Sequence, residues 1–245
     1  MASALINNTV QVYFASVLGM DHEGMVSMFE ALLEIGLSGF LGCSSAIFKA
    51  AMVEFFHNAS VRDCMVVSTV QGKPVVISEE LFAGTFELPL EGLTDLHEVP
   101  QDLVIEARRS FSYDGKLLST SCKKREMVFE FRLLNNILAK YVTVKAGSFD
   151  AVTHERFLMM TAIYGGVPFN WGRLLFKIFK DMVTPATRQA RGYAVQICVL
   201  LKNAPDLELG ESKEFALLKI LTAKTVGTYI AKNKKIYVEE DEPVV

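Results

Sequence analysis

The sequence predicts a mainly α-helical α+β fold, a multi-helix globular domain with a small β-hairpin. Most apolar residues recur at intervals of three and four, which is typical of amphipathic helices. Residues 65–77 instead form two β-branched runs around a glycine-containing turn, which is typical of a hairpin. Hydrophobic residues make up 51% of the 245-residue chain, enough for a large core. Two uncharged stretches, 35–48 and 157–172, fall short of the roughly 20 apolar residues that span a bilayer, and polar residues interrupt the uncharged stretch 1–20.

The first forty residues are expected to contain a strand and a helix. Residues 9–14 alternate as in a strand; helical spacing also fits them, but their β-branched and aromatic content favours the strand. A helix follows Asp21, whose carboxylate is placed to cap it, and Gly36 and Gly39 end it. No basic residue precedes Asp21, so the start of the chain does not resemble a secretion signal.

Two further helices flank the hairpin. The first is expected to begin near Ser44 or Ser45 and to stop near Asn58. After the hairpin, Ser78 caps a short helix whose first turn carries two glutamates, where the helix dipole favours acids.

The predicted domain organisation is one globular unit over residues 1–245. An irregular connector, 91–122, divides it into two loosely separated halves, 1–90 and 123–231. Residues 239–245 form an acidic tail.

The second half is expected to consist of helices. One begins at Lys123, and the others cover 153–164, the stretch from Asn170 to Thr184, 187–202 and 215–231. The stretch after Asn170 has the clearest amphipathic pattern in the chain. For 193–201 a buried strand is the alternative.

The sequence contains no common catalytic or cofactor motif. A P-loop, a dinucleotide fingerprint, a nucleophile elbow and a zinc-protease pair of histidines are all missing. The four cysteines are scattered without a C-x-x-C pair, which indicates reduced thiols in an intracellular protein, cytoplasmic or nuclear. We therefore expect no enzyme, no cofactor, no metal site and no small-molecule ligand.

Two catalytic sites are the alternatives to a non-enzymatic protein. A hydrolase would use His57 as the base for Cys64. A metal-dependent strand-transfer site would need acids at the ends of buried strands. The available acids are Asp63, Asp95, Asp102, Asp114, Asp150 and Asp181. They lie beside capping residues or on charged helix faces, which favours structural roles.

Two basic clusters are the candidate nucleic-acid-binding residues. They are Lys123, Lys124 and Arg125 at the expected start of one helix, and Lys232, Lys234 and Lys235 at the end of another. The net charge of −3 does not favour a nucleic-acid binder as a whole, and each cluster also suits a solvated helix end. Nucleic-acid binding would require the two clusters to converge on one face.

The hairpin and its flanks resemble a known domain. The pattern Val67-x-x-Val70-x-Gly72-Lys73-x-Val75-x-Ile77-Ser78, followed by Phe82, Phe86, Leu88 and Pro89, resembles the plant transposon protein family, found in coding regions of plant retroelements. The likeness covers roughly residues 25–205. It departs from the family pattern at 134–142, which lacks a tryptophan, and at 191–194.

The resemblance implies a helical, gag-like or accessory module of a plant retrotransposon, and it carries over no active-site residue. We therefore expect a non-enzymatic interaction or assembly module that binds a protein partner or itself and does not enter membranes. The alternative is a nucleic-acid-binding accessory protein of transposition.

Overall fold

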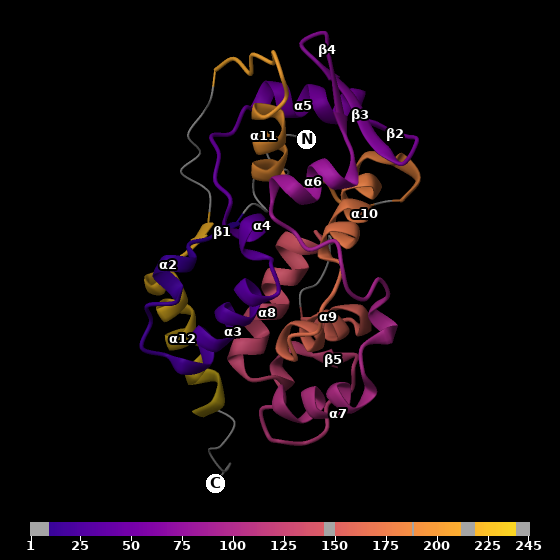
Figure 1. Cartoon of the computed structure of the whole chain (residues 1–245). Coiled ribbons are helices and arrows are strands. Elements are labelled where there is room, and N and C mark those ends of the chain that lie inside the picture. The colour runs from indigo at the N-terminus through magenta and orange to yellow at the C-terminus, as the bar shows by residue number, and fades with distance from the viewer. Residues whose placement is uncertain (1–9, 145–149, 188, 212–218, 239–245) are drawn as a thin grey trace.

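The structure is a computed structural model that describes residues 10–144, 150–187, 189–211 and 219–238. The side chains of residues 10, 219 and 234–238 lie outside this description. Helices dominate the described residues and the strands form small separate sheets, so the predicted mainly α-helical α+β fold is confirmed. In Figure 1 the three-stranded sheet lies in the upper part with α5, α6 and α11, and α3, α7, α8 and α9 lie in the lower part.

The elements have the following bounds. The helices are α2 (Phe14–Val17), α3 (Glu23–Glu34), α4 (Ser38–Gly42), α5 (Lys49–Asn58), α6 (Glu79–Thr85), α7 (Gln101–Ser110), α8 (Phe129–Ile137), α9 (His154–Tyr164), α10 (Trp171–Val183), α11 (Ala194–Lys202) and α12 (Ala223–Val238). Short helical turns are η1 (Leu96–Glu98), η2 (Lys124–Glu126), η3 (Leu138–Val142) and η4 (Pro185–Thr187).

The strands pair in three groups. Strand β1 (Val10–Val12) is parallel to β7 (Lys219–Leu221). Strands β2 (Ser60–Arg62), β3 (Met65–Val70) and β4 (Lys73–Ile77) form an antiparallel sheet in that order. Strand β5 (Cys122–Lys123) is antiparallel to β6 (Ala151–Val152).

Several predicted elements are confirmed. The strand at the start of the chain, the hairpin of 65–77 and the helices at 153–164 and after Asn170 all form. Residues 194–202 are a helix, so the alternative of a buried strand there is wrong. The hairpin closes through Gln71 and Gly72, whose φ values of 51° and 73° are those of the two-residue turn favoured in hairpins.

For the helix predicted after Asp21, the predicted cap is wrong and one of the two predicted terminating glycines is confirmed. His22, not Asp21, is the cap, because its Nδ1 accepts a hydrogen bond from the Met25 amide at 3.3 Å. The helix runs to Glu34, and Gly36 ends it as predicted: its φ is 80°, and the Leu37 amide next to it donates to the Leu32 carbonyl at 3.1 Å. Gly39 lies instead in α4.

Two other predicted helix starts are wrong, because both helices begin later in the chain than predicted. The helix expected from Ser44 begins at Lys49, after the Phe48 amide has donated to Cys198 Sγ at 3.5 Å. The helix expected from Lys123 begins at Phe129. The buried Arg132 guanidinium donates to the carbonyls of Arg125 and Met127, at 2.5 and 2.6 Å.

The last predicted helix, 215–231, is also placed differently. Residues 219–221 form β7, and α12 runs from Ala223 to Val238. Residues 215–218 and the predicted acidic tail, 239–245, lie outside the described residues. The division into halves 1–90 and 123–231 stays a prediction.

Buried apolar side chains from all along the described chain form one contiguous core cluster. In its upper part, the Phe82 ring lies among four other phenylalanines, with centroid distances of 5.3 to 6.1 Å. These four are Phe40, Phe86, Phe176 and Phe179. The cluster joins α4, α6 and α10, so it fixes the helix that directly follows β4.

The close approach of α4 to the end of α6 gives a stability prediction. A Cβ added at Gly39 would overlap the backbone carbonyl oxygen of Phe86, whereas a Cβ added at Gly84, in α6, would meet nothing within 4 Å. Gly39→Ala should destabilise the protein by about 1–3 kcal/mol through overpacking. Gly84→Ala should stabilise it by about 0.5–1 kcal/mol, because alanine is the better helix former. Urea unfolding of both variants measures the difference, and equal effects would contradict the close packing.

Candidate functional site

The candidate site is the outer edge of β4, which no other described strand pairs with and which we define as the backbone of Pro74, Val76 and Ser78. A two-residue turn places Val70 and Lys73 in a hydrogen-bonded pair, and such pairs then alternate along the ladder. The register therefore directs the backbone groups of Val75 and Ile77 toward β3. The groups of Pro74 and Val76 point outward.

The donors and acceptors at this edge have a distinctive pattern. Val76 presents both its N–H and its C=O, whereas Pro74 presents only its C=O because proline has no N–H. Ser78 continues in extended geometry, with φ −87° and ψ 169°, so its N–H also points outward. The Ser78 carbonyl is already used, because it accepts the Phe82 amide at 3.0 Å.

An apolar hollow of about 330 Å³ lies beside this edge. Its walls include Leu81 of α6, Leu200 of α11 and Pro205. Two of the apolar side chains here are open to solvent, since Val76 is 50% exposed and Leu81 is 49% exposed. Apolar side chains are therefore open to solvent beside the strand.

Contacts at both ends keep β4 in place. The backbone N–H of Gln71 donates to Glu54 Oε1 at 2.8 Å, and the Lys73 ammonium donates to the backbone carbonyl of Asp206. After the strand, the Ser78 hydroxyl accepts the Leu81 amide at 3.1 Å, as predicted for the cap of α6. The edge is therefore a preformed feature. Sequence reasoning missed it, although a proline two residues after a hairpin turn is itself typical of an edge strand.

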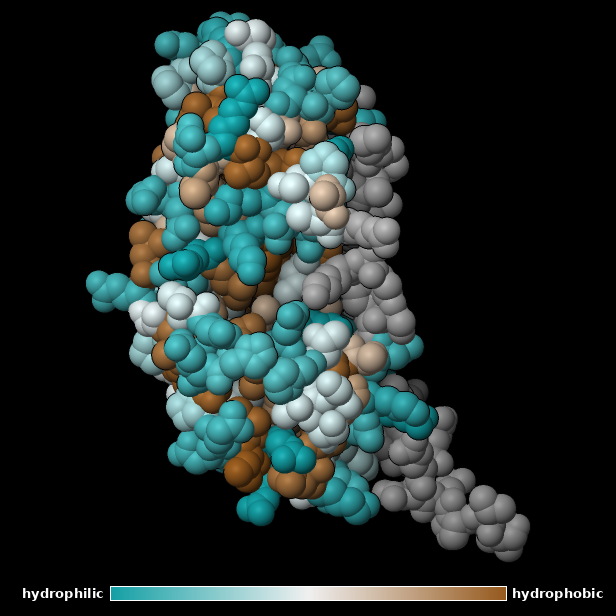
Figure 2. All heavy atoms as spheres, turned by 90° about the vertical axis from the view of Figure 1, so that its right-hand side faces the viewer, coloured by the Kyte–Doolittle hydropathy of each residue, from teal (hydrophilic) through white to brown (hydrophobic). Residues whose placement is uncertain are grey.

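A polar cleft of about 620 Å³ lies between η1, α9 and α10. Figure 2 shows the face of the molecule on the right-hand side of Figure 1, where hydrophobic residues lie at the floor of a hollow at mid-height and hydrophilic ones surround it. His97 Nδ1 lies 2.8 Å from Asp95 Oδ1, and hydrogen bonds from the His97 backbone and ring lower the pKa of that carboxyl. Their side chains are 67% and 62% exposed, so the pair lacks the dry surroundings of a tuned acid–base site.

The first predicted basic cluster lies just before α8. Lys123 and Arg125 are exposed, whereas Lys124 is half-buried and donates to Asn136 Oδ1 at 3.3 Å. Burial lowers the pKa of Lys124, and the nearby Asp150 carboxylate opposes that effect.

The other cluster lies on α12. The Tyr229 hydroxyl donates to the Phe129 carbonyl at 3.0 Å, which holds α12 against the first turn of α8. Lys232, which lies about one helical turn beyond Tyr229, is exposed. The side chains of Lys234 and Lys235 lie outside the described residues.

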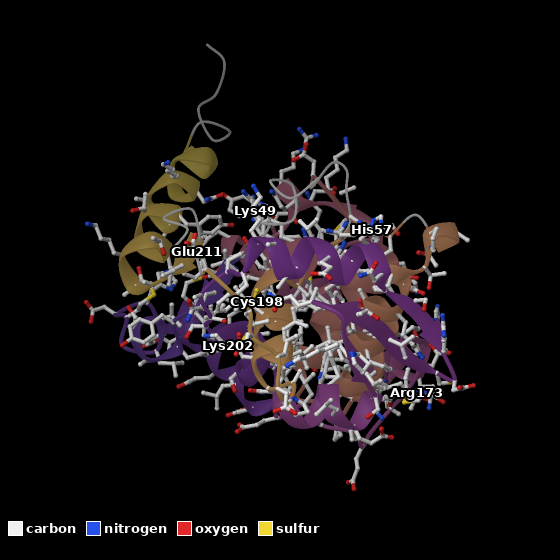
Figure 3. All side chains as sticks on the ribbon, turned by 90° about the horizontal axis from the view of Figure 1, so that it is seen from above. Lys49, His57, Arg173, Cys198, Lys202 and Glu211 are labelled. Atoms are coloured by element: carbon white, nitrogen blue, oxygen red, sulfur yellow. The ribbon has the colours of Figure 1, made fainter. Side chains whose placement is uncertain are left out.

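The two residues of the hydrolase alternative are not brought together. His57 is exposed in the last turn of α5, where Figure 3 shows it at the opposite end of the helix from Lys49. Strand β2 carries the chain away before it reaches Cys64, which is exposed in the turn between β2 and β3. Cys198 lies beneath α5 (Figure 3), where the Phe48 amide reaches its sulfur.

The six acids considered for a metal site are dispersed. Only Asp95 and Asp181 border the same cleft. Asp114 is held in a turn by Lys116 and Ser112, whose hydrogen bonds lower its pKa to about 2. Across the described residues, no group of three or more histidines, cysteines or acids is arranged to hold a metal ion.

Comparison with protein-family models, with curated proteins and with solved structures finds no match. The resemblance to the plant transposon protein family therefore stays a prediction from the sequence. Among the described helices, none is both long enough and apolar enough to cross a bilayer.

The thiols give a prediction for the hydrolase alternative. Burial raises the pKa of Cys43 to about 12 and that of Cys122 to about 11, and it also raises the pKa of Cys198. At pH 8 a thiol probe should therefore modify Cys64 first, because thiolates react and thiols do not. Labelling should give one fast equivalent, which Cys64→Ser removes.

The decisive control is His57→Ala. The labelling rate of Cys64 should not change in this variant, because the imidazole does not contact the sulfur. A tenfold slower reaction would restore the Cys–His alternative.

Proposed function

We propose that this chain is an intracellular, non-enzymatic assembly module of plant-retrotransposon origin, in which two copies associate through antiparallel pairing of their β4 edges. The resemblance of the hairpin region supports the origin. The single observation that supports the association is the match between the donors and acceptors of one β4 edge and those of a second copy.

The match appears when Val76 of one copy is placed opposite Val76 of the other. The two residues then exchange both N–H···O=C hydrogen bonds, as an outward-facing pair in an antiparallel ladder does. In this register, Pro74 lies opposite Ser78 of the second copy. The Ser78 amide donates to the Pro74 carbonyl. The return hydrogen bond is not needed: proline has no N–H to donate, and the Ser78 carbonyl opposite it already accepts the Phe82 amide.

A second copy fits this edge better than an arbitrary strand. The N–H that is missing at Pro74 lies opposite the Ser78 carbonyl, which needs no further donor because it already accepts the Phe82 amide. Proline at an edge commonly prevents continuous strand addition. Here it limits the pairing to two hydrogen bonds at Val76 and two between Pro74 and Ser78. We expect an interface of four hydrogen bonds to bury less than the roughly 1,200 Å² of stable complexes, and the dimer is therefore expected to be weak.

Association should therefore depend on concentration and on the Val76 amide. The weight-average mass, from light scattering or sedimentation, should rise from monomer toward dimer between about 10 µM and 1 mM. Val76→Pro removes the outward N–H without breaking a hydrogen bond to β3, and it should weaken association about tenfold or more.

The matched control is Val61→Pro. Val61 pairs with Val66 one residue before a two-residue turn, so its amide also points outward, but from the β2 edge. This variant should associate like the parent protein. A chain that stays monomeric at 1 mM, or equal effects of the two prolines, would contradict the proposal.

One observation favours the alternative function, a nucleic-acid-binding accessory protein. The hydrogen bond between Tyr229 and Phe129 supports the convergence of the exposed cations Lys123, Arg125 and Lys232 at one end of α8. Their charges would contact phosphates and release counterions.

Salt dependence tests this alternative. Replacing Lys123, Arg125 and Lys232 together by alanine should reduce the slope of log affinity against log salt by about 2 to 3 for DNA. The control removes three exposed cations from other elements, Lys49 of α5, Arg173 of α10 and Lys202 of α11, which are labelled in Figure 3. Absence of binding at 50 mM salt, or identical slopes for the two variants, would exclude it.

A further inference from the structure

A second cavity, of about 450 Å³, lies between α3, α8 and the C-terminal end of α9. These helices lie in the lower part of Figure 1, away from β4. The volume falls in the range of pockets that hold small molecules. We call it the α3–α8 pocket.

The walls of this pocket are mostly apolar and are held in place. They include Met28 and Ala31 of α3 and Phe131 and Leu134 of α8. The Phe131 ring lies 3.9 Å from the ring of Phe111, centroid to centroid, and contacts Tyr164 edge-on at 5.9 Å. Because aromatic neighbours fix this wall, the pocket does not depend on a ligand for its shape.

One charged side chain, Glu130, lines the same pocket. Glu130 is half-buried. Its carboxylate lies against α3 at Gly24, so close that a Cβ added to this glycine would lie 2.8 Å from Glu130 Oε1. No hydrogen bond or ion pair joins this carboxylate to another described residue. A carboxylate partly removed from water beside an apolar wall lacks a counter-charge, and a cation bound there would supply one.

We propose that the α3–α8 pocket binds a small organic cation, an apolar body of about ten non-hydrogen atoms that ends in an ammonium group paired with Glu130. The apolar body displaces water from the walls at Met28, Ala31 and Phe131. The ammonium group donates to the Glu130 carboxylate. This site is independent of β4, so Val76→Pro leaves it intact.

The test compares three ligands of the same shape and different charge on the full chain. They are 4-phenylbutylamine, 4-phenylbutanol and 4-phenylbutyrate, titrated at pH 7 and followed by amide chemical shifts. The amine should bind about tenfold more tightly than the alcohol, because a charge-assisted hydrogen bond replaces a neutral one. The carboxylate should bind most weakly. Shifts should concentrate on α3 and α8.

Two variants assign the binding to the pocket and its charge. Glu130→Gln should remove the advantage of the amine over the alcohol and leave the alcohol unchanged, whereas Glu30→Gln, on the exposed face of α3, should change neither. Ala31→Leu should fill the cavity and weaken both ligands, with thermal unfolding confirming that each variant is folded. Equal affinities of amine and alcohol, an unaltered preference in Glu130→Gln, or no binding of any ligand at 10 mM would each overturn the proposal.

Discussion

The desolvated ring cluster around Phe82 is the constraint on which the upper part of the molecule depends. Phe82 lies in the first turns of α6, four residues after Ser78, and its ring packs against rings from α4 and α10. Burying an aromatic side chain stabilises a fold more than almost any other single side chain. Because α6 cannot move without opening this cluster, the end of β4 and its outward-facing amides are fixed as well. The proposed assembly edge is therefore preorganised by the core.

The lower part is organised by two buried guanidinium groups. Arg132 holds the turn before α8, and Arg156 of α9 donates to Asn135 Oδ1 at 3.0 Å and to the Ala151 carbonyl at 2.7 Å. Burial lowers the pKa of Arg156, which nevertheless stays charged because arginine's ordinary value is so high. Planar forks of this kind satisfy several carbonyls at once, and they keep the irregular segments on either side of α8 in one conformation.

Elements whose signals are local could be predicted from the sequence, and elements set by distant partners could not. The turn at Gln71-Gly72 and the caps at Ser78 and Asn170 depend on neighbours within about four residues, and all three form. Strand β7 was missed because its partner lies at the other end of the chain. For the candidate sites, the proline of β4 was visible in the sequence. The α3–α8 pocket was not, because it exists only where three helices meet.

The parallel pairing of β1 with β7 has a consequence for synthesis. The hydrogen bond from the Ala223 amide to the Ser16 hydroxyl, beside this pair, joins residues 207 positions apart. At ordinary rates of translation, the first strand emerges from the ribosome about 10 to 40 s before its partner is made. The nascent chain must therefore keep that strand unpaired until β7 has been made. The pairing of β1 with β7 is a late step in folding, and it joins segments that lie far apart in the sequence.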